Sequence, residues 1–120
     1  MARPPSPRPR APERGAAERR FATLVSALTG KRGVTVGSAK RGFGSGTLQV
    51  NGRIFAMVAR DRIVLKLSAA RVAELVAAGY GSWFDAGKGR PMKEWVALAP
   101  DTRHWRSLAD EARAFVTQDS

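Results

Sequence analysis

The sequence has 120 residues, of which 43% are hydrophobic, and a formal net charge of +11. This length and composition are typical of one globular domain, and the absence of cysteine excludes disulfide frameworks, thiolate metal sites and thiol nucleophiles. The excess of 21 Lys and Arg over 10 Asp and Glu favours polyanionic partners such as nucleic acid, although the arginine bias of a GC-rich bacterial genome also explains it.

The N-terminal segment is basic and rich in proline. Proline removes backbone N–H donors and blocks regular structure, so residues 1–12 are expected to form a disordered tail and 13–118 a single domain. The tail lacks the apolar run of a secretory signal, and no apolar stretch is long enough to cross a bilayer. We therefore expect a cytoplasmic protein without a membrane partner.

The first predicted element is a helix. Apolar residues at helical spacing predict it over Glu13–Thr29, and Gly30 is expected to end it. The following stretch, Gly33–Gly46, is glycine-rich and reads mostly as a loop. Within this loop, Val34–Val36 can hold a short strand.

A three-stranded antiparallel meander is predicted next. Thr47–Val50 alternates polar and apolar residues, and Asn51-Gly52 supplies the two positive-φ residues of a type I′ hairpin turn. Two further strands, Arg53–Ala59 and Arg62–Leu67, complete the meander on either side of a tight turn.

The third strand of this meander has two unlike faces. Its uncharged face is expected to point toward the helices, and the other face to form a mixed apolar and cationic patch. On the preceding strand, one of two alternating sets must join the mixed face, which is why that face is part apolar and part cationic. The uncharged face consists of Ile63, Leu65 and Leu67, and the mixed face consists of Arg62, Val64 and Lys66. The two alternating sets on the preceding strand are Ile54, Ala56 and Val58, or Phe55 and Met57. Arg62 and Lys66, together with Arg53, form the candidate interaction surface.

The second half of the chain predicts two helices and two strands. Ser68 is positioned to cap the first of these two helices and Gly79 to end it, and Asp101 is positioned to cap the second, which is the last helix of the chain. The fold class is α+β, an antiparallel sheet with helices packed on it, in the order α-β(3)-α-β(2)-α. The predicted ranges are Ala69–Ala78 for the helix, Trp83–Asp85 and Met92–Leu98 for the strands, and Pro100-Asp101 for the start of the last helix.

No catalytic constellation is recognisable. The loop Arg41–Gly46 has the glycines of a phosphate cradle, but a strand is predicted where the dinucleotide fingerprint needs a helix. His104 is the only histidine and is expected in the first turn of the last helix. It cannot by itself build a usual transition-metal site or a triad. We therefore expect no enzyme activity, no cofactor and no metal.

Two features have both a functional and a structural interpretation. Lys88 and Arg90 lie between glycines and form a candidate anion-binding turn, although an ordinary turn has the same composition. The three tryptophans (Trp83, Trp95 and Trp105) can be core residues or a stacking platform for single-stranded nucleic acid.

Several motifs occur in the order typical of one family. Gly42-Phe43-Gly44-Ser45-Gly46 is followed by Asn51-Gly52-Arg53-Ile54-Phe55-Ala56, then by Trp83-Phe84-Asp85 and Gly89-Arg90-Pro91-Met92-Lys93-Glu94-Trp95. From about residue 18 to 117 the chain thereby resembles the TfoX/Sxy N-terminal domain family, in the stand-alone form common in actinobacteria. The resemblance implies the same α-β(3)-α-β(2)-α order, similar to secretion chaperones and to the related YjbR/MmcQ proteins.

The resemblance also bears on function. The namesake proteins are regulators of natural competence with a second, helical C-terminal domain, for which 120 residues leave no room. The family has no established catalytic residues, so none is transferred to this chain.

The leading hypothesis is therefore a non-enzymatic regulatory or interaction module acting through a protein partner or its own dimer. The alternative is direct nucleic-acid binding through the basic surface and the cationic tail, and an uncharacterised enzyme is a third hypothesis. A single contiguous basic face would favour nucleic acid, whereas scattered arginines around an apolar patch would favour a protein interface.

Overall fold

The computed structural model describes residues 15–37, 46–85, 89 and 91–119. Three helices and six strands are formed in these residues, and the strands make one antiparallel sheet. The elements are α1 (Ala16–Leu28), β1 (Val34–Gly37), β2 (Thr47–Val50), β3 (Arg53–Ala59), β4 (Arg62–Lys66), α2 (Ala69–Ala77), β5 (Gly81–Phe84), β6 (Met92–Leu98) and α3 (Trp105–Asp119).

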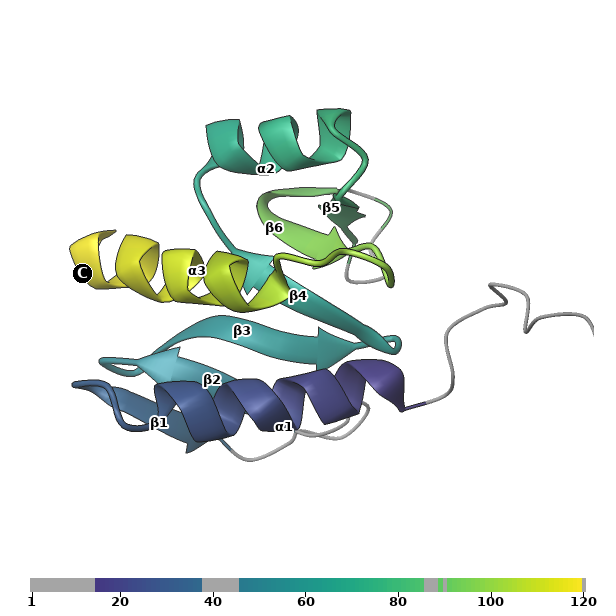
Figure 1. The fold of residues 1–120 in the computed structure, drawn as a ribbon. Coiled ribbons are helices and arrows are strands. Elements are labelled where there is room, and N and C mark those ends of the chain that lie inside the picture. The colour runs from purple at the N-terminus through teal and green to yellow at the C-terminus, as the bar shows by residue number, and fades with distance from the viewer. Residues whose placement is uncertain (1–14, 38–45, 86–88, 90, 120) are drawn as a thin grey trace, which may run out of the picture.

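The sheet has the strand order β1-β2-β3-β4-β6-β5, so β1 and β5 are its two edges. All three helices contribute to the main core cluster, together with alternate residues of the strands, so they cover one face of the sheet (Figure 1). Along β4, Ile63, Leu65 and the following Leu67 belong to this cluster, which confirms that the uncharged face points toward the helices. The α+β class is confirmed.

The element order differs from the predicted one by one strand. Residues Val34–Gly37 form β1, which pairs along its whole length with β2, so the observed order is α-β(4)-α-β(2)-α. Glycines on both sides of this segment lowered the strand signal. Pairing with β2 supplies the backbone hydrogen bonds that its sequence alone does not predict.

Both tight turns of the meander use left-handed backbone conformations. Asn51 and Gly52 have φ of 53° and 83°, which is the geometry predicted for this hairpin. Arg60 and Asp61, between β3 and β4, have φ of 53° and 63° although neither is glycine. The second turn therefore holds two residues in a region that L-amino acids rarely adopt.

A β-bulge in β3 explains which of its residues face the helices. Leu48 pairs with Ala56, but the next residue of β2 pairs with Ile54, so Phe55 is the extra residue of the bulge. Phe55 and Ala56 are adjacent in sequence and both are fully buried in the main core. The helix-facing set therefore combines Phe55 with Ala56 and Val58, while Met57 packs on the opposite face.

The ends of α2 agree with the sequence. The Ser68 hydroxyl accepts a hydrogen bond from the Arg71 N–H at 3.2 Å. At the other end Gly79 has φ of 86°, its N–H donates to the Val76 carbonyl, and the N–H of Tyr80 donates to the Leu75 carbonyl. These two bonds define a Schellman motif, which leads the chain directly into β5.

The helix α1 ends beside Gly30 as predicted, with Thr29 as its C-cap, although Gly30 is not in the left-handed conformation. The start of the last helix was predicted wrongly. The last helix begins at Trp105 instead of Asp101, so His104 precedes its first turn. The segment before it is held as a turn, because the N–H of Thr102 donates to Ala99 and its hydroxyl donates to the Tyr80 carbonyl.

Candidate interaction surface

The sheet face opposite the helices carries a second, smaller apolar cluster. Val64 is fully buried at its centre, because its register partners Met57 and Ala97 flank it on β3 and β6. The expectation that Val64 contributes to an exposed patch is therefore wrong. The cluster comprises Ala59, Val64, Phe84 and Ala97, with the half-buried Met57 and Trp95 packed against it.

Cations cover the aromatic rings of this face. The Lys66 ammonium lies 5.4 Å from the centre of the Trp95 ring and pairs with the Glu94 carboxylate at 3.2 Å. The Arg60 guanidinium lies 5.9 Å from the centre of the Phe84 ring. Since these ring faces are occupied by cations, they are not free to stack on bases.

The three cations of the candidate surface do not form one site. Arg53 and Lys66 line a hollow of about 370 Å³ beside Trp95. Arg62 lies at the other end of β4 and lines a separate hollow of about 210 Å³ beside β5, where its Nη1 donates to the Ser82 hydroxyl at 3.3 Å. Lys88 and Arg90, the candidate anion-binding turn, lie outside the described residues.

The three tryptophans lie in three different places. Trp95 is on the face opposite the helices, Trp83 is on the edge strand β5, and Trp105 starts α3. Arg20 and Arg106 approach the ring of Trp105 at 5.7 and 5.2 Å. A common stacking platform is therefore not formed.

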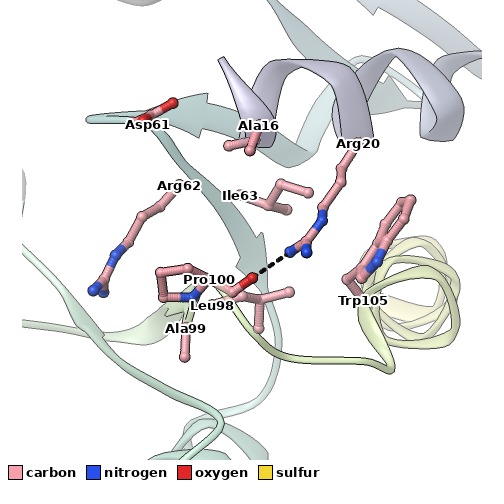
Figure 2. A pocket seen from close by; sticks show the side chains of 10 residues that line it. Ala16, Arg20, Asp61, Arg62, Ile63, Leu98, Ala99, Pro100 and Trp105 are labelled. Atoms are coloured by element: carbon pink, nitrogen blue, oxygen red, sulfur yellow. Dashed lines mark hydrogen bonds between the residues drawn. The ribbon is translucent and has the colours of Figure 1, made fainter. Parts of the chain in front are cut away.

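Trp105 belongs to a small structural pocket between α1, β4 and the segment before α3 (Figure 2). Arg20 crosses this pocket and its Nη1 donates to the Pro100 carbonyl at 2.6 Å. The pocket volume is about 20 Å³, which is room for roughly one water molecule. The Arg20 hydrogen bond holds the segment that leads into α3, and the pocket is too small for a substrate.

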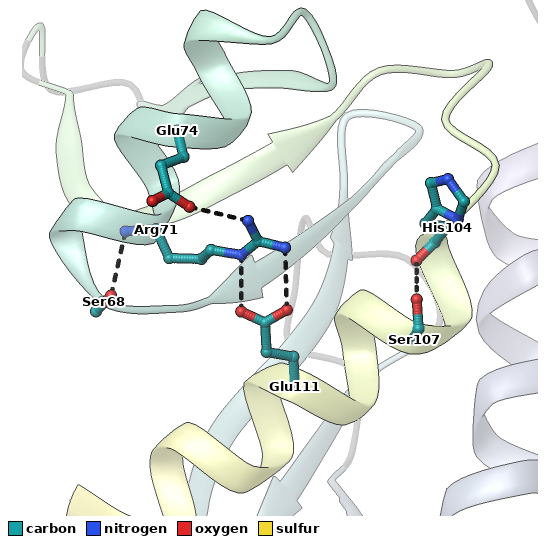
Figure 3. A network of polar contacts seen from close by, with 6 residues as sticks. All are labelled: Ser68, Arg71, Glu74, His104, Ser107 and Glu111. Carbon is teal, nitrogen blue, oxygen red and sulfur yellow. Dashed lines mark hydrogen bonds and ion pairs between the residues drawn. The ribbon is translucent and has the colours of Figure 1, made fainter.

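Charged residues on α2 and α3 form a polar network (Figure 3). Arg71 pairs with Glu74 on its own helix and with Glu111 on α3. The hydrogen bonds that the Arg71 guanidinium donates to Glu111, and then to Glu74, raise its pKa above the usual value. An arginine that is already always protonated gains no acid–base role from this shift, so the network is structural.

The described residues show no group of three or more His, Asp or Glu that could hold a metal ion. His104 makes an edge-on contact with Tyr80, with ring centres 6.4 Å apart. Residues 38–45 of the glycine-rich stretch, which include Lys40 and Arg41, lie outside the described ranges. The expectation of a non-enzymatic chain without cofactor or metal stays a prediction.

Sequence reasoning missed the edge strand β5 as a surface. The exposed large apolar side chains of the described residues are Val36, Tyr80, Trp83 and Met92, with 48, 43, 42 and 39% of their surface accessible. Val36 is on the edge strand β1, Trp83 is on the edge strand β5, Tyr80 precedes β5 directly, and Met92 pairs with Phe84 of β5. The sequence already placed the large apolar side chain of Trp83 in a short predicted strand. Trp83 is an edge residue only because of the strand order, and one sequence does not reveal strand order.

Two hollows flank β5, one on each side of the sheet. On the helix side, a hollow of about 470 Å³ is lined by Trp83, Ala69 and Ala73 of α2, Pro91 and Lys93. On the opposite side lies the hollow of about 210 Å³ that contains Arg60, Arg62 and Ser82. The edge strand therefore separates a mainly apolar hollow from a cationic one.

Comparison of the chain with protein-family models, with curated proteins and with solved structures gave no match. Within the ranges that the structure describes, no helix has the length and apolar character needed to cross a bilayer.

Proposed function

We propose that this chain is a non-enzymatic interaction module that binds a protein partner through the edges of its sheet. The observation that carries the proposal is the position of the exposed large apolar side chains, which in the described residues all lie on or beside β1 and β5. Exposed apolar side chains gathered at an unpaired strand edge are typical of a protein-binding surface. A regulatory role of the TfoX N-terminal domain type, in the cytoplasm of a bacterium, is the biological setting that the motif resemblance implies for such a module.

The described part of the chain holds the smaller share of the net charge, which favours a protein over a nucleic acid as the partner of this part. Within the described residues, Arg71, Arg113 and Lys66 are paired with carboxylates. More than half of the net charge belongs to segments outside the described residues, which contain one acid, Glu13, and the cations Arg3, Arg8, Arg10, Arg14, Lys40, Arg41, Lys88 and Arg90.

Direct nucleic-acid binding is the second candidate, and the net charge of +11 is the observation that favours it. On this alternative the cationic tail would supply most of the phosphate contacts. The two candidates therefore differ in which part of the chain is needed: the sheet edges for a protein, the N-terminal segment for a nucleic acid.

The test is affinity capture with the full chain from its native host, with and without nuclease. We expect captured protein to survive nuclease and to fall when Val36→Ser and Trp83→Ser are combined. The matched control combines Ala22→Ser and Ala27→Ser, two exposed positions on α1. Capture that nuclease abolishes, or that both pairs of substitutions leave unchanged, would contradict the proposal.

A further inference from the structure

The outer edge of β5 has backbone groups available for pairing. The Tyr80 carbonyl accepts from the Ala99 N–H at 2.9 Å, so Tyr80 and Ala99 form a hydrogen-bonded pair of the antiparallel ladder. Such pairs alternate along the ladder, so Ser82 is the next residue bonded to β6. The N–H and C=O groups of Gly81 and Trp83 then point away from β6. Within the described residues no strand lies on that side.

On the helix side of this edge, Trp83 forms one wall of the apolar hollow. The opposite wall is α2, where two alanines, Ala69 and Ala73, leave space that larger side chains would fill. Lys93 and Pro91 complete the lining. With about 470 Å³ available beside an indole ring, the hollow has room for one or two aliphatic side chains.

On the opposite side, two guanidinium groups converge on β5. Arg60 Nη1 donates to the Asp85 carbonyl at 2.7 Å and Arg62 Nη1 donates to the Ser82 hydroxyl at 3.3 Å. Each guanidinium has five N–H donors, so most donors of both remain for a ligand. Among the described residues that line the hollow, Asp85 is the one acid, beside Arg60 and Arg62, so this lining keeps a positive charge.

These three features together specify the ligand. A strand added to β5 would send alternate side chains to the two faces of the sheet, about 5 Å from the corresponding side chains of β5. One set would enter the apolar hollow beside Trp83. The other set would stand beside Ser82, within reach of the guanidinium that already contacts that hydroxyl.

We propose that β5 is the docking edge for an extended peptide segment of a partner protein in which apolar and acidic residues alternate. The inference rests on the proposed function and names its partner chemistry. Charge complementarity selects this occupant. A second copy of the chain is disfavoured because it carries the same charge of +11, and because its own β5, Gly81-Ser82-Trp83-Phe84, has no carboxylate to offer Arg60 and Arg62.

The experiment uses a labelled, acetylated octapeptide of alternating valine and aspartate, titrated into the full chain and followed by fluorescence polarisation. We expect saturable binding, and slower hydrogen exchange of the Gly81 and Trp83 amides when the peptide is bound. Combining Arg60→Gln with Arg62→Gln should weaken binding by about tenfold or more, because two charge-assisted hydrogen bonds are lost. The matched control combines Lys31→Gln with Arg32→Gln, which removes the same charge from an exposed turn remote from β5 in the sequence.

A second measurement on the wild-type chain keeps the test independent of the folding of the variants. N-methylation of the peptide at alternate residues removes every second N–H donor. Strand pairing requires that one alternate set abolishes binding while the other set is tolerated. Equal effects of the two sets, or an equal loss in the Lys31/Arg32 control, would overturn docking on β5.

The same experiments separate this inference from the function on which it rests. If the octapeptide does not bind although nuclease-resistant capture depends on Val36 and Trp83, the peptide inference fails and the protein-binding function stands. If capture is lost on nuclease treatment, the function itself fails.

Discussion

Arg71 on α2 binds both carboxylate oxygens of Glu111 on α3 (Figure 3). The Arg71 Nε lies 2.8 Å from Oε2 of Glu111, and the Arg71 Nη2 lies 3.3 Å from Oε1. The same guanidinium holds Glu74 of its own helix through Nη1 at 2.9 Å. One arginine therefore joins the helix that walls the apolar hollow to the C-terminal helix of the domain. The two-point contact fixes the orientation of the carboxylate as well as its distance.

This geometry predicts unequal coupling in double-mutant cycles. We expect a coupling free energy of about 1 kcal/mol between Arg71 and Glu111 and of about 0.3 kcal/mol between Arg71 and Glu74. Both values are small because both pairs are partly exposed and screened by solvent. Denaturant unfolding of the Arg71→Ala, Glu111→Ala and double variants measures the first value, and the Glu74→Ala cycle is the matched control. Equal couplings would mean that the two-point contact adds nothing.

The pH dependence of this coupling follows from the direction of the Arg71 shift. The pKa of Arg71 is raised in the folded state, so its contribution is fully present below the pKa of the unfolded chain and is lost only as the pH rises through the higher folded value. Arg71 therefore introduces no pH dependence in the neutral range. A coupling that falls between neutral and mildly alkaline pH would contradict this assignment.

The hairpin at Asn51-Gly52 predicts a backbone cost at Gly52. Its φ is 83°, and a Cβ at this position would meet nothing within 4 Å, so any loss of stability comes from the backbone conformation alone. We expect Gly52→Val to lower the free energy of unfolding by more than about 1 kcal/mol. Gly30→Val is the control, because Gly30 is equally open but is not left-handed. This control should change the denaturant midpoint of unfolding little, whereas Gly52→Val should lower it. Equal midpoints for both variants would show that the turn tolerates valine.

Local patterns were sufficient for the elements whose ends are set by their own residues. The Ser68 cap, the Gly79 Schellman motif and the Asn51-Gly52 turn depend on neighbours within a few positions, and all three are present. The start of α3 was misplaced because Thr102 is held by the Tyr80 carbonyl, a contact across 22 positions. The strand β1 was predicted only as a short strand that the loop can hold, and was left out of the predicted order, because its pairing with β2 is also non-local.

The candidate site shows the same limit. Arg62 and Lys66 were grouped with Arg53 because strand alternation places both on one face. Lys66 binds Glu94, however, and Arg62 reaches Ser82, so they serve different parts of the sheet. The role of β5 as an edge depends on β6 pairing between it and β4. Strand order of this kind is a property of the whole fold, and periodicity along one strand carries no information about it.

The basic tail predicts an effect of truncation on binding but not on folding. Removing residues 1–11 should leave the thermal midpoint nearly unchanged while weakening the affinity for duplex DNA, because several phosphate contacts are lost. Calorimetry and a DNA titration at fixed salt measure the two effects. A clear fall in the midpoint would show that the tail packs on the domain.

Charge reversal on β4 distinguishes the two candidate partners. We expect Arg62→Glu with Lys66→Glu to reduce protein capture and to leave the salt dependence of DNA binding unchanged. If nucleic acid lies on this face, the double variant should instead flatten the slope of log affinity against log salt by about two, since each lost phosphate contact removes about 0.9. The matched control is Lys31→Glu with Arg32→Glu.

The two edges of the sheet, β1 and β5, are different strands with different neighbours. If β1 of one molecule paired with β5 of the next, the contact would be head-to-tail, and such contacts produce open fibres unless the rotation closes a ring. The charge of +11 opposes this, because like-charged molecules repel over roughly a Debye length, about 8 Å at physiological salt and about 3 Å at 1 M. The positive charge thus opposes self-association of a sheet whose two edge strands each have one paired side in the described residues. Light scattering should therefore rise when concentrated salt screens this charge.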